Sequence, residues 1–127
     1  MIDVVLDTSA ILAKLYREPG GERVDAVRKS AAISAVNYAE IVSKLIGDGM
    51  PFPEAEDTLE RLGCQIVEAD RYRSARTGAL HEKTKRSGVS LGDRYCLQLA
   101  LELGVPVLTT DRRWAALDLG VQIVLLR

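Results

Sequence analysis

The sequence predicts a single α/β domain, a three-layer sandwich in which a short, mainly parallel sheet of about five strands lies between helices. Three observations support this fold class. Short apolar runs alternate along the chain with longer segments of helical periodicity. The apolar runs are nearly continuous, which is typical of strands covered on both faces. Residues 1–127 also contain no repeat, low-complexity tract or linker that would divide them into two domains.

The predicted strands are short, and most are rich in β-branched residues. Glycine- or proline-containing turns separate most of them from the neighbouring segments. In chain order they cover residues 4–6, 32–33, 65–67, 106–108 and 121–125. The order of these strands within the sheet does not follow from the sequence.

The segments between the strands have apolar residues at helical spacing. They are predicted to form helices over residues 9–16, 22–30, 36–46, 53–62, 71–85 and 91–103. The apolar face of the 36–46 helix is predicted to consist of Ala39, Val42, Leu45 and Ile46. Residues 71–86 carry six lysines and arginines against a single acid, Glu82, and we interpret this basic stretch as a solvated helix face.

Composition indicates a globular protein without a zinc site. The hydrophobic fraction is 47% and the charged fraction 28%, both ordinary for a soluble domain. Cys64, Cys96 and His81 are too few and too scattered to supply four zinc ligands. We therefore expect two reduced thiols in apolar positions, no role for His81, and a cytoplasmic protein.

The chain start and the overall charge limit the possible locations and partners. Residues 1–3 lack the basic and apolar regions of a signal peptide, and no apolar run approaches the roughly 18 residues of a membrane helix. The net charge of −1 argues mildly against binding of nucleic acid through overall charge. That objection weakens where carboxylates and basic residues are segregated, as they are in this sequence.

Two acids directly follow predicted strands, where open parallel sheets bind their ligands. Asp7 follows residues 4–6, and Asp111 follows the strand at 106–108 after two threonines. Capping of the next helix would explain each acid equally well, because an aspartate ahead of a helix satisfies its free N–H groups.

Asp93 lies in the first turn of the 91–103 helix, which is apolar nearly all round. On a helical wheel it falls between Leu97 and Ala100, and an inward-facing carboxylate is costly unless it is paired or bound to a metal. This placement favours a functional role. The alternative is a capping box with Ser90.

Glu40 is not selected by periodicity. It lies on the flank of its helix, away from the predicted apolar face, where an ion pair with Lys44 would explain it. If the aspartates converge, several carboxylates without a counter-charge predict a site for Mg²⁺ or Mn²⁺. Such ions catalyse phosphodiester hydrolysis.

The full length of the chain resembles the PIN-domain ribonucleases, and within them the VapC-type toxins. Each motif alone is weak, but together, in this order and at these separations, they make a specific match. The matching blocks are Asp7-Thr8-Ser9-Ala10, Asn37-Tyr38-Ala39-Glu40, Ser90-Leu91-Gly92-Asp93-Arg94 and Thr109-Thr110-Asp111-Arg112-Arg113-Trp114.

The resemblance implies a metal-dependent endoribonuclease. Four acids match the family's catalytic and metal-binding positions, Asp7, Glu40, Asp93 and Asp111. Residues beside them would position substrate or support the acids, and these are Thr8, Ser9, Thr110, Arg94 and Arg112. It also implies an RNA substrate, one or two Mg²⁺ or Mn²⁺ ions, a cognate VapB-type antitoxin and a homodimer. The lack of a membrane-length apolar run separately predicts no membrane association.

Other interpretations of single residues and of the whole chain remain. Arg94, Arg112 and Arg113 would either contact phosphates or neutralise the acids, and Trp114 more often belongs to the core. A catalytically silent PIN-like module that binds RNA or protein would have lost its acids. An aspartyl phosphatase would usually have an acid at the position of Ser9, and a receiver domain would need an acidic pair after the first strand.

Overall fold

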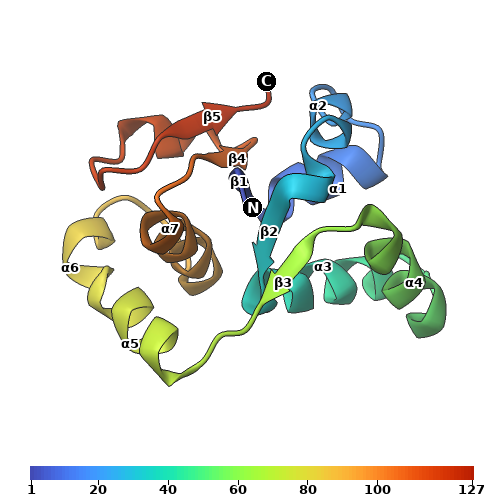
Figure 1. The fold of residues 1–127 in the computed structure, drawn as a ribbon, viewed down its shortest axis with the longest axis horizontal. Helices are drawn as coiled ribbons and strands as arrows, with labels where there is room; N and C mark the ends of the chain where they lie inside the picture. The colour runs from blue at the N-terminus through green and yellow to red at the C-terminus, as the bar shows by residue number, and fades with distance from the viewer.

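The computed structural model describes residues 1–127 and has the predicted α/β architecture (Figure 1). The strands are β1 (Val4–Leu6), β2 (Ala31–Ser34), β3 (Gln65–Val67), β4 (Val107–Thr109) and β5 (Ile123–Leu125). They form one sheet in the order β3-β2-β1-β4-β5, and every neighbouring pair is parallel. The order places β1 at the centre, so the residue that follows it lies between the ends of β2 and β4.

Most predicted helices agree with the structure to within one residue. The helices are α1 (Thr8–Leu15), α2 (Glu22–Asp25), α3 (Ala35–Gly47), α4 (Phe52–Leu62), α5 (Arg71–Ala79), α6 (His81–Thr84) and α7 (Leu91–Leu103). Two short 3-10 helices complete the fold, η1 (Arg28–Ser30) and η2 (Arg112–Ala116).

Two predicted helices were wrong as continuous elements. The segment 22–30 is divided into α2 and η1, because the amides of Val27 and Ser30 donate to carbonyls three residues back, as in 3-10 turns. The segment 71–85 is divided at Leu80, which donates to the Thr77 carbonyl three residues back and buries its side chain in the core. In the second segment the chain tightens where the Leu80 side chain turns inward.

The two faces of the sheet carry separate apolar clusters. Val4 and Leu6 of β1 belong to the cluster on one face, and Val5 belongs to the cluster on the other. Figure 1 shows α1 to α4 on the first side and α5 to α7 on the second. Trp114 is fully buried in the second cluster, which confirms its expected place in the core.

Burial on both faces holds for the three central strands only. Every residue of β1, β2 and β4 is buried. The edge strands differ from the expectation: β3 is largely exposed and β5 is half-buried. The well-packed part of the sheet is therefore the part whose carboxyl ends face Asp7, Asp111 and the start of α3.

The apolar face predicted for α3 was partly wrong. The buried residues of this helix are Asn37, Ile41 and Leu45, spaced four apart, whereas Ala39 and Ile46 are exposed. The prediction assumed that only apolar residues face inward. Asn37 overturns it, because this polar side chain is fully buried in the first turn of α3.

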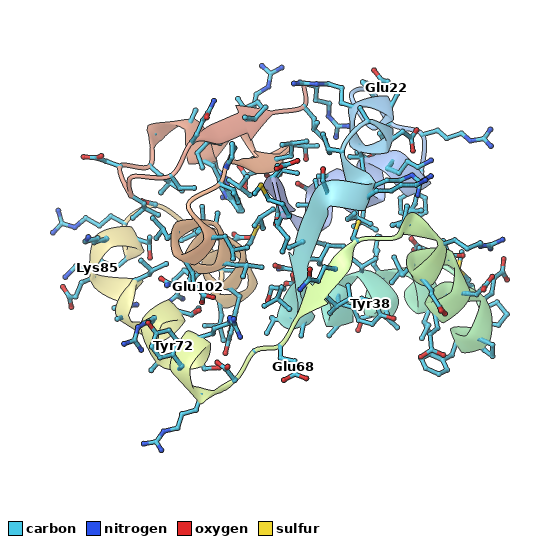
Figure 2. All side chains as sticks on the ribbon, viewed as in Figure 1. Glu22, Tyr38, Glu68, Tyr72, Lys85 and Glu102 are labelled. Atoms are coloured by element: carbon cyan, nitrogen blue, oxygen red, sulfur yellow. The ribbon has the colours of Figure 1, made fainter.

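The basic segment forms an outer surface, as interpreted. Tyr72 on α5 and Lys85 just after α6 are labelled at this edge of the molecule in Figure 2, and both are exposed. Arg73 pairs with Glu102 at 2.9 Å, and Lys85 pairs with Glu82 at 3.2 Å. None of the helices combines the length and apolar character that crossing a bilayer requires.

Candidate active site

Four acidic side chains come together at the carboxyl ends of the central strands. Asp7 follows β1, Asp111 follows β4, Glu40 lies in the helix after β2, and Asp93 lies in the first turn of α7. Asp93 raises the pKa of Asp7, and Glu40 and Asp111 each raise the pKa of Asp93. The negative charges are therefore close enough to repel one another.

Asp7 does not use its side chain to cap α1. It occupies the N-cap position, but no capping hydrogen bond is formed. Its Oδ2 accepts hydrogen bonds from Ser9 Oγ at 2.7 Å and Thr109 Oγ1 at 2.9 Å. Only 4% of the residue is exposed, and this burial raises the pKa of Asp7 to about 6.

Backbone amides fix the direction of both hydroxyl bonds to Asp7. Ser9 Oγ accepts the amide of Thr110 at 3.0 Å, and Thr109 Oγ1 accepts the amide of Asp111 at 3.0 Å. With an N–H directed at each oxygen, each hydroxyl proton is free to point at Asp7. The hydroxyls therefore hold one carboxylate oxygen of Asp7 in place.

The threonine hydroxyl in this network is that of Thr109, a residue to which the family resemblance assigned no role. Thr110 contributes its backbone amide, whereas the buried hydroxyl on Asp7 belongs to Thr109. Strand geometry is the signal that was available, because successive side chains of β4 point to opposite faces. Only one of the two threonine side chains can therefore lie on the face of the sheet that the Asp7 side chain occupies.

Glu40 is bound by side chains from its own helix and from α1. Its Oε1 accepts Thr8 Oγ1 and Asn37 Nδ2, each at 2.8 Å. The alternative ion pair with Lys44 is not formed, because Lys44 pairs with Asp48 at 3.5 Å instead. Periodicity did not identify Glu40, and the structure places it beside the other acids.

Asp93 forms the capping box that was the alternative interpretation of this residue, and it also lies among the acids. Its Oδ2 accepts the Ser90 amide at 2.9 Å, and Ser90 Oγ accepts the Asp93 amide at 3.1 Å, which completes a capping box. The side chain is also half-buried, and burial raises its pKa above the ordinary value, with Glu40 and Asp111 adding to the rise. Asp93 therefore caps α7 and borders the acidic cluster.

A buried thiol lies close to the acids. Cys96 is fully buried one turn after Asp93, and burial together with the charges of Asp7, Asp93 and Glu40 raises the pKa of the Cys96 thiol well above its usual value. The thiol stays protonated and fills apolar space. Neither Cys96 nor Cys64 forms a disulfide, as expected.

Asp111 differs from the other acids because it has a cationic partner. It accepts the Arg113 amide at 3.0 Å as the cap of η2, and it pairs with Arg113 Nη2 at 2.7 Å. These bonds lower the pKa of Asp111. Arg94 instead donates to the Ser90 carbonyl at 3.4 Å, and Arg112 is exposed. The arginine that neutralises an acid is therefore Arg113.

The donor set of the cluster fits a hard divalent cation. No lysine or arginine forms an ion pair with Asp7, Glu40 or Asp93, while Asp111 has one with Arg113. Carboxylate oxygens are the ligands that Mg²⁺ and Mn²⁺ prefer. The side chains are not gathered tightly enough to form a ready metal-binding group. A cation held here would draw in Asp7, Glu40 and Asp93, and water would complete its coordination.

Comparison with known proteins links this chain to one family. A family model for the PIN domain matches residues 4–119. No curated protein sequence is a significant match. The fold is similar to a toxin–antitoxin complex from Klebsiella pneumoniae, with a TM-score of 0.77, 17% identity and 98% of each chain covered.

Two further solved structures have the same fold. DNA-bound VapBC from Salmonella typhimurium covers 100% of both chains with a TM-score of 0.76 and 19% identity. A VapC toxin from Mycobacterium tuberculosis, described as cleaving the sarcin–ricin loop, has a TM-score of 0.73 and 15% identity; the match covers 94% of this chain and 99% of that one. At such identities the similarity establishes the fold.

Proposed function

Because the chain belongs to the PIN-domain family, we propose that it is a metal-dependent endoribonuclease that hydrolyses phosphodiester bonds of RNA. The observation that supports this most directly is that Asp93 lies close enough to Asp7 and Glu40 for their charges to repel, while none of the three acids has a cationic partner. Keeping such a cluster costs folding free energy. A binding module would have no need of it.

The chain's own residues have distinct parts in the proposed reaction. Asp7, Glu40, Asp93 and Asp111 form the catalytic and metal-binding set. A bound Mg²⁺ or Mn²⁺ would supply an activated water and neutralise charge that develops on the phosphate. Ser9, together with the neighbouring buried threonine hydroxyl, holds Asp7 Oδ2 in a fixed orientation.

Residues at the rim of the cluster would bind the RNA backbone. Thr8, Thr110, Arg94 and Arg112 are the candidates, because each adjoins one of the acids in the sequence. A guanidinium group beside a negatively charged cluster would offset repulsion between the acids and an approaching phosphate. Arg113 has this charge too, but it is already paired with Asp111.

We further propose that the chain is the toxin of a VapBC-type pair and forms a homodimer. The similar structures include toxin–antitoxin complexes. The chain also leaves apolar side chains exposed, Ile46 at 43% and Phe52 at 55%, at the facing ends of α3 and α4. A VapB-type antitoxin would cover such residues and block the acidic cluster.

The proposed activity is tested by incubating the purified chain with a mixed-sequence single-stranded RNA, in Mn²⁺, in Mg²⁺ and in EDTA. We expect cleavage that requires the cation and is lost in Asp93→Asn. The matched control is Asp118→Asn, an exposed acid away from the cluster, which should cleave like the parent chain.

The outcomes separate the candidate functions. Cleavage that persists in EDTA or in Asp93→Asn would contradict the proposed mechanism. A folded chain that neither cleaves RNA nor binds Mn²⁺ would favour the catalytically silent binding module. Binding of Mn²⁺ without cleavage would point to a substrate with a structure that the mixed RNA does not contain, and defined tRNA and rRNA fragments would then be assayed.

A further inference from the structure

We infer that Asn37 is a positioning residue that holds the Glu40 carboxylate in place for the divalent cation. This inference rests on the proposed function, since it concerns the same site. Glu40 is an exposed side chain on a helix, so its carboxylate would otherwise sample several rotamers. Asn37 lies one turn earlier and is fully buried.

The carboxamide of Asn37 joins two elements that carry acids. Its Nδ2 donates to Glu40 Oε1 at 2.8 Å and to the Gly92 carbonyl at 3.0 Å. Gly92 directly precedes Asp93 in the first turn of α7. One side chain therefore fixes Glu40 on α3 relative to the turn that holds Asp93. In Figure 2 the label of Tyr38 marks the residue of α3 that follows Asn37.

The chemistry of its neighbours sets the orientation of this carboxamide. Both neighbours are acceptors, the Glu40 carboxylate and the Gly92 carbonyl, so the NH₂ group must face them. The consequence is that Asn37 Oδ1 is buried without a hydrogen-bond partner. A buried polar atom without a partner costs free energy of folding. The two bonds donated by Nδ2 are thus kept at a cost to folding, and they fix Glu40 against the first turn of α7.

Gly92 leaves room for the Glu40 carboxylate, which packs against it. A Cβ atom at this position would lie 2.3 Å from Glu40 Oε2 and 2.9 Å from Oε1. The glutamate carboxylate thus occupies the space that any other residue at 92 would fill. Because the conflict is with the end of a flexible side chain, Gly92→Ala should displace the carboxylate and leave the α7 backbone intact.

The test measures Mn²⁺ affinity of the full chain without RNA, from the electron paramagnetic resonance signal of free Mn²⁺. We expect Asn37→Ala and Gly92→Ala each to raise the Kd by about tenfold or more, the effect typical of residues that orient metal ligands. The control is Thr77→Ala, which removes another fully buried polar side chain, in α5, and should leave the Kd unchanged.

A double-mutant cycle separates positioning from a general structural role. If Asn37 acts through Glu40, then adding Asn37→Ala to Glu40→Gln should change the Kd little further. A tenfold additional loss in that background would overturn the inference. Gly92→Ala provides an independent measurement if Asn37→Ala proves poorly folded, since alanine favours the helix.

Failure of the inference is distinguishable from failure of the proposed function. If the parent chain binds Mn²⁺ and both Asn37→Ala and Gly92→Ala bind it equally well, the inference is wrong and the nuclease proposal stands. If the parent chain binds no Mn²⁺ at millimolar concentration, the proposed function is wrong and the inference is wrong with it.

Discussion

At the scale of single residues, the buried carboxyl group of Asp7 is costly to ionise. Its pKa rises from an ordinary 3.8 to about 6, chiefly through burial, and this corresponds to about 3 kcal/mol. Two hydroxyl bonds reduce that cost without removing it. The cost is understandable for a ligand of a cation, because a divalent charge would favour the ionised form.

We expect the metal-free chain to lose stability as the pH rises from about 4 to about 6. In that interval Asp7 is protonated in the folded state and ionised in the unfolded state, so the free energy of unfolding falls with rising pH. The raised pKa of Asp93 acts in the same direction. Urea denaturation in EDTA between pH 4 and pH 8 measures this dependence.

The same measurement on Asp7→Asn isolates the buried carboxylate. The variant should be more stable than the parent chain at pH 8, by up to about 3 kcal/mol, and should depend less on pH. The exposed Asp118→Asn should keep the parent profile. An Asp7→Asn variant with the full parent slope would show that Asp7 does not titrate in this interval.

The two adjacent threonines make a matched pair for a second test. Thr109→Val removes a donor from Asp7 and an acceptor from the Asp111 amide, and should cost about 1–3 kcal/mol. Thr110→Val keeps the backbone bond to Ser9 and should change stability by less than about 0.5 kcal/mol. Equal effects in thermal unfolding would contradict this assignment of the two hydroxyls.

The sequence was least informative about which individual residues form the site. Strand ends identified Asp7 and Asp111, and helical periodicity identified Asp93. Glu40 was found through the family resemblance alone, because an exposed glutamate on a helix flank fits many solvated pairs. Asn37 was not assigned a role, since nothing in its spacing distinguishes a buried asparagine from a surface one.

At the scale of secondary-structure elements, close backbone contacts decide which glycines are replaceable. At Gly21 an added Cβ would lie 2.3 Å from the Ala13 carbonyl oxygen, which is backbone and cannot move aside cheaply. At Gly78, inside α5, an added Cβ would meet nothing within 4 Å. The junction of α1 and α2 therefore depends on glycine, and α5 does not.

Replacing these two glycines by alanine should therefore have opposite effects on thermal unfolding. Gly21→Ala should destabilise the chain by about 1–3 kcal/mol, the usual range for overpacking. Gly78→Ala should stabilise it by about 0.5–1 kcal/mol, because alanine favours the helix. A neutral Gly21→Ala would mean that α1 and α2 can separate without cost.

The first and last residues of a helix could be predicted where the whole segment has one helical periodicity. α7 agrees with the prediction because its capping box and the glycine at its end mark both limits. The segment 71–85 has one helical pattern in sequence, yet Leu80 interrupts it to reach the core. Such a turn depends on tertiary packing, which sequence periodicity does not contain.

At the scale of the whole molecule, the most buried strands support the acidic cluster. β1, β2 and β4 are buried throughout, whereas the edge strands β3 and β5 are not. The cluster lies where these three strands end, so its elements are held by both apolar clusters of the fold. Repulsion between the acids consequently acts on the stability of the entire sheet.

A divalent cation should therefore raise the melting temperature of the whole chain. Binding to the folded state adds about 2.7 kcal/mol at a cation concentration of 100 Kd, which shifts melting by several degrees for a domain of this size. Millimolar Mg²⁺ or Mn²⁺ should produce the shift, and NaCl of equal ionic strength should not. Asp93→Asn should melt at a higher temperature in EDTA, because repulsion is reduced, and respond less to the cation. Melting that is unchanged by the cation and by Asp93→Asn would mean that the acids do not form a cation site.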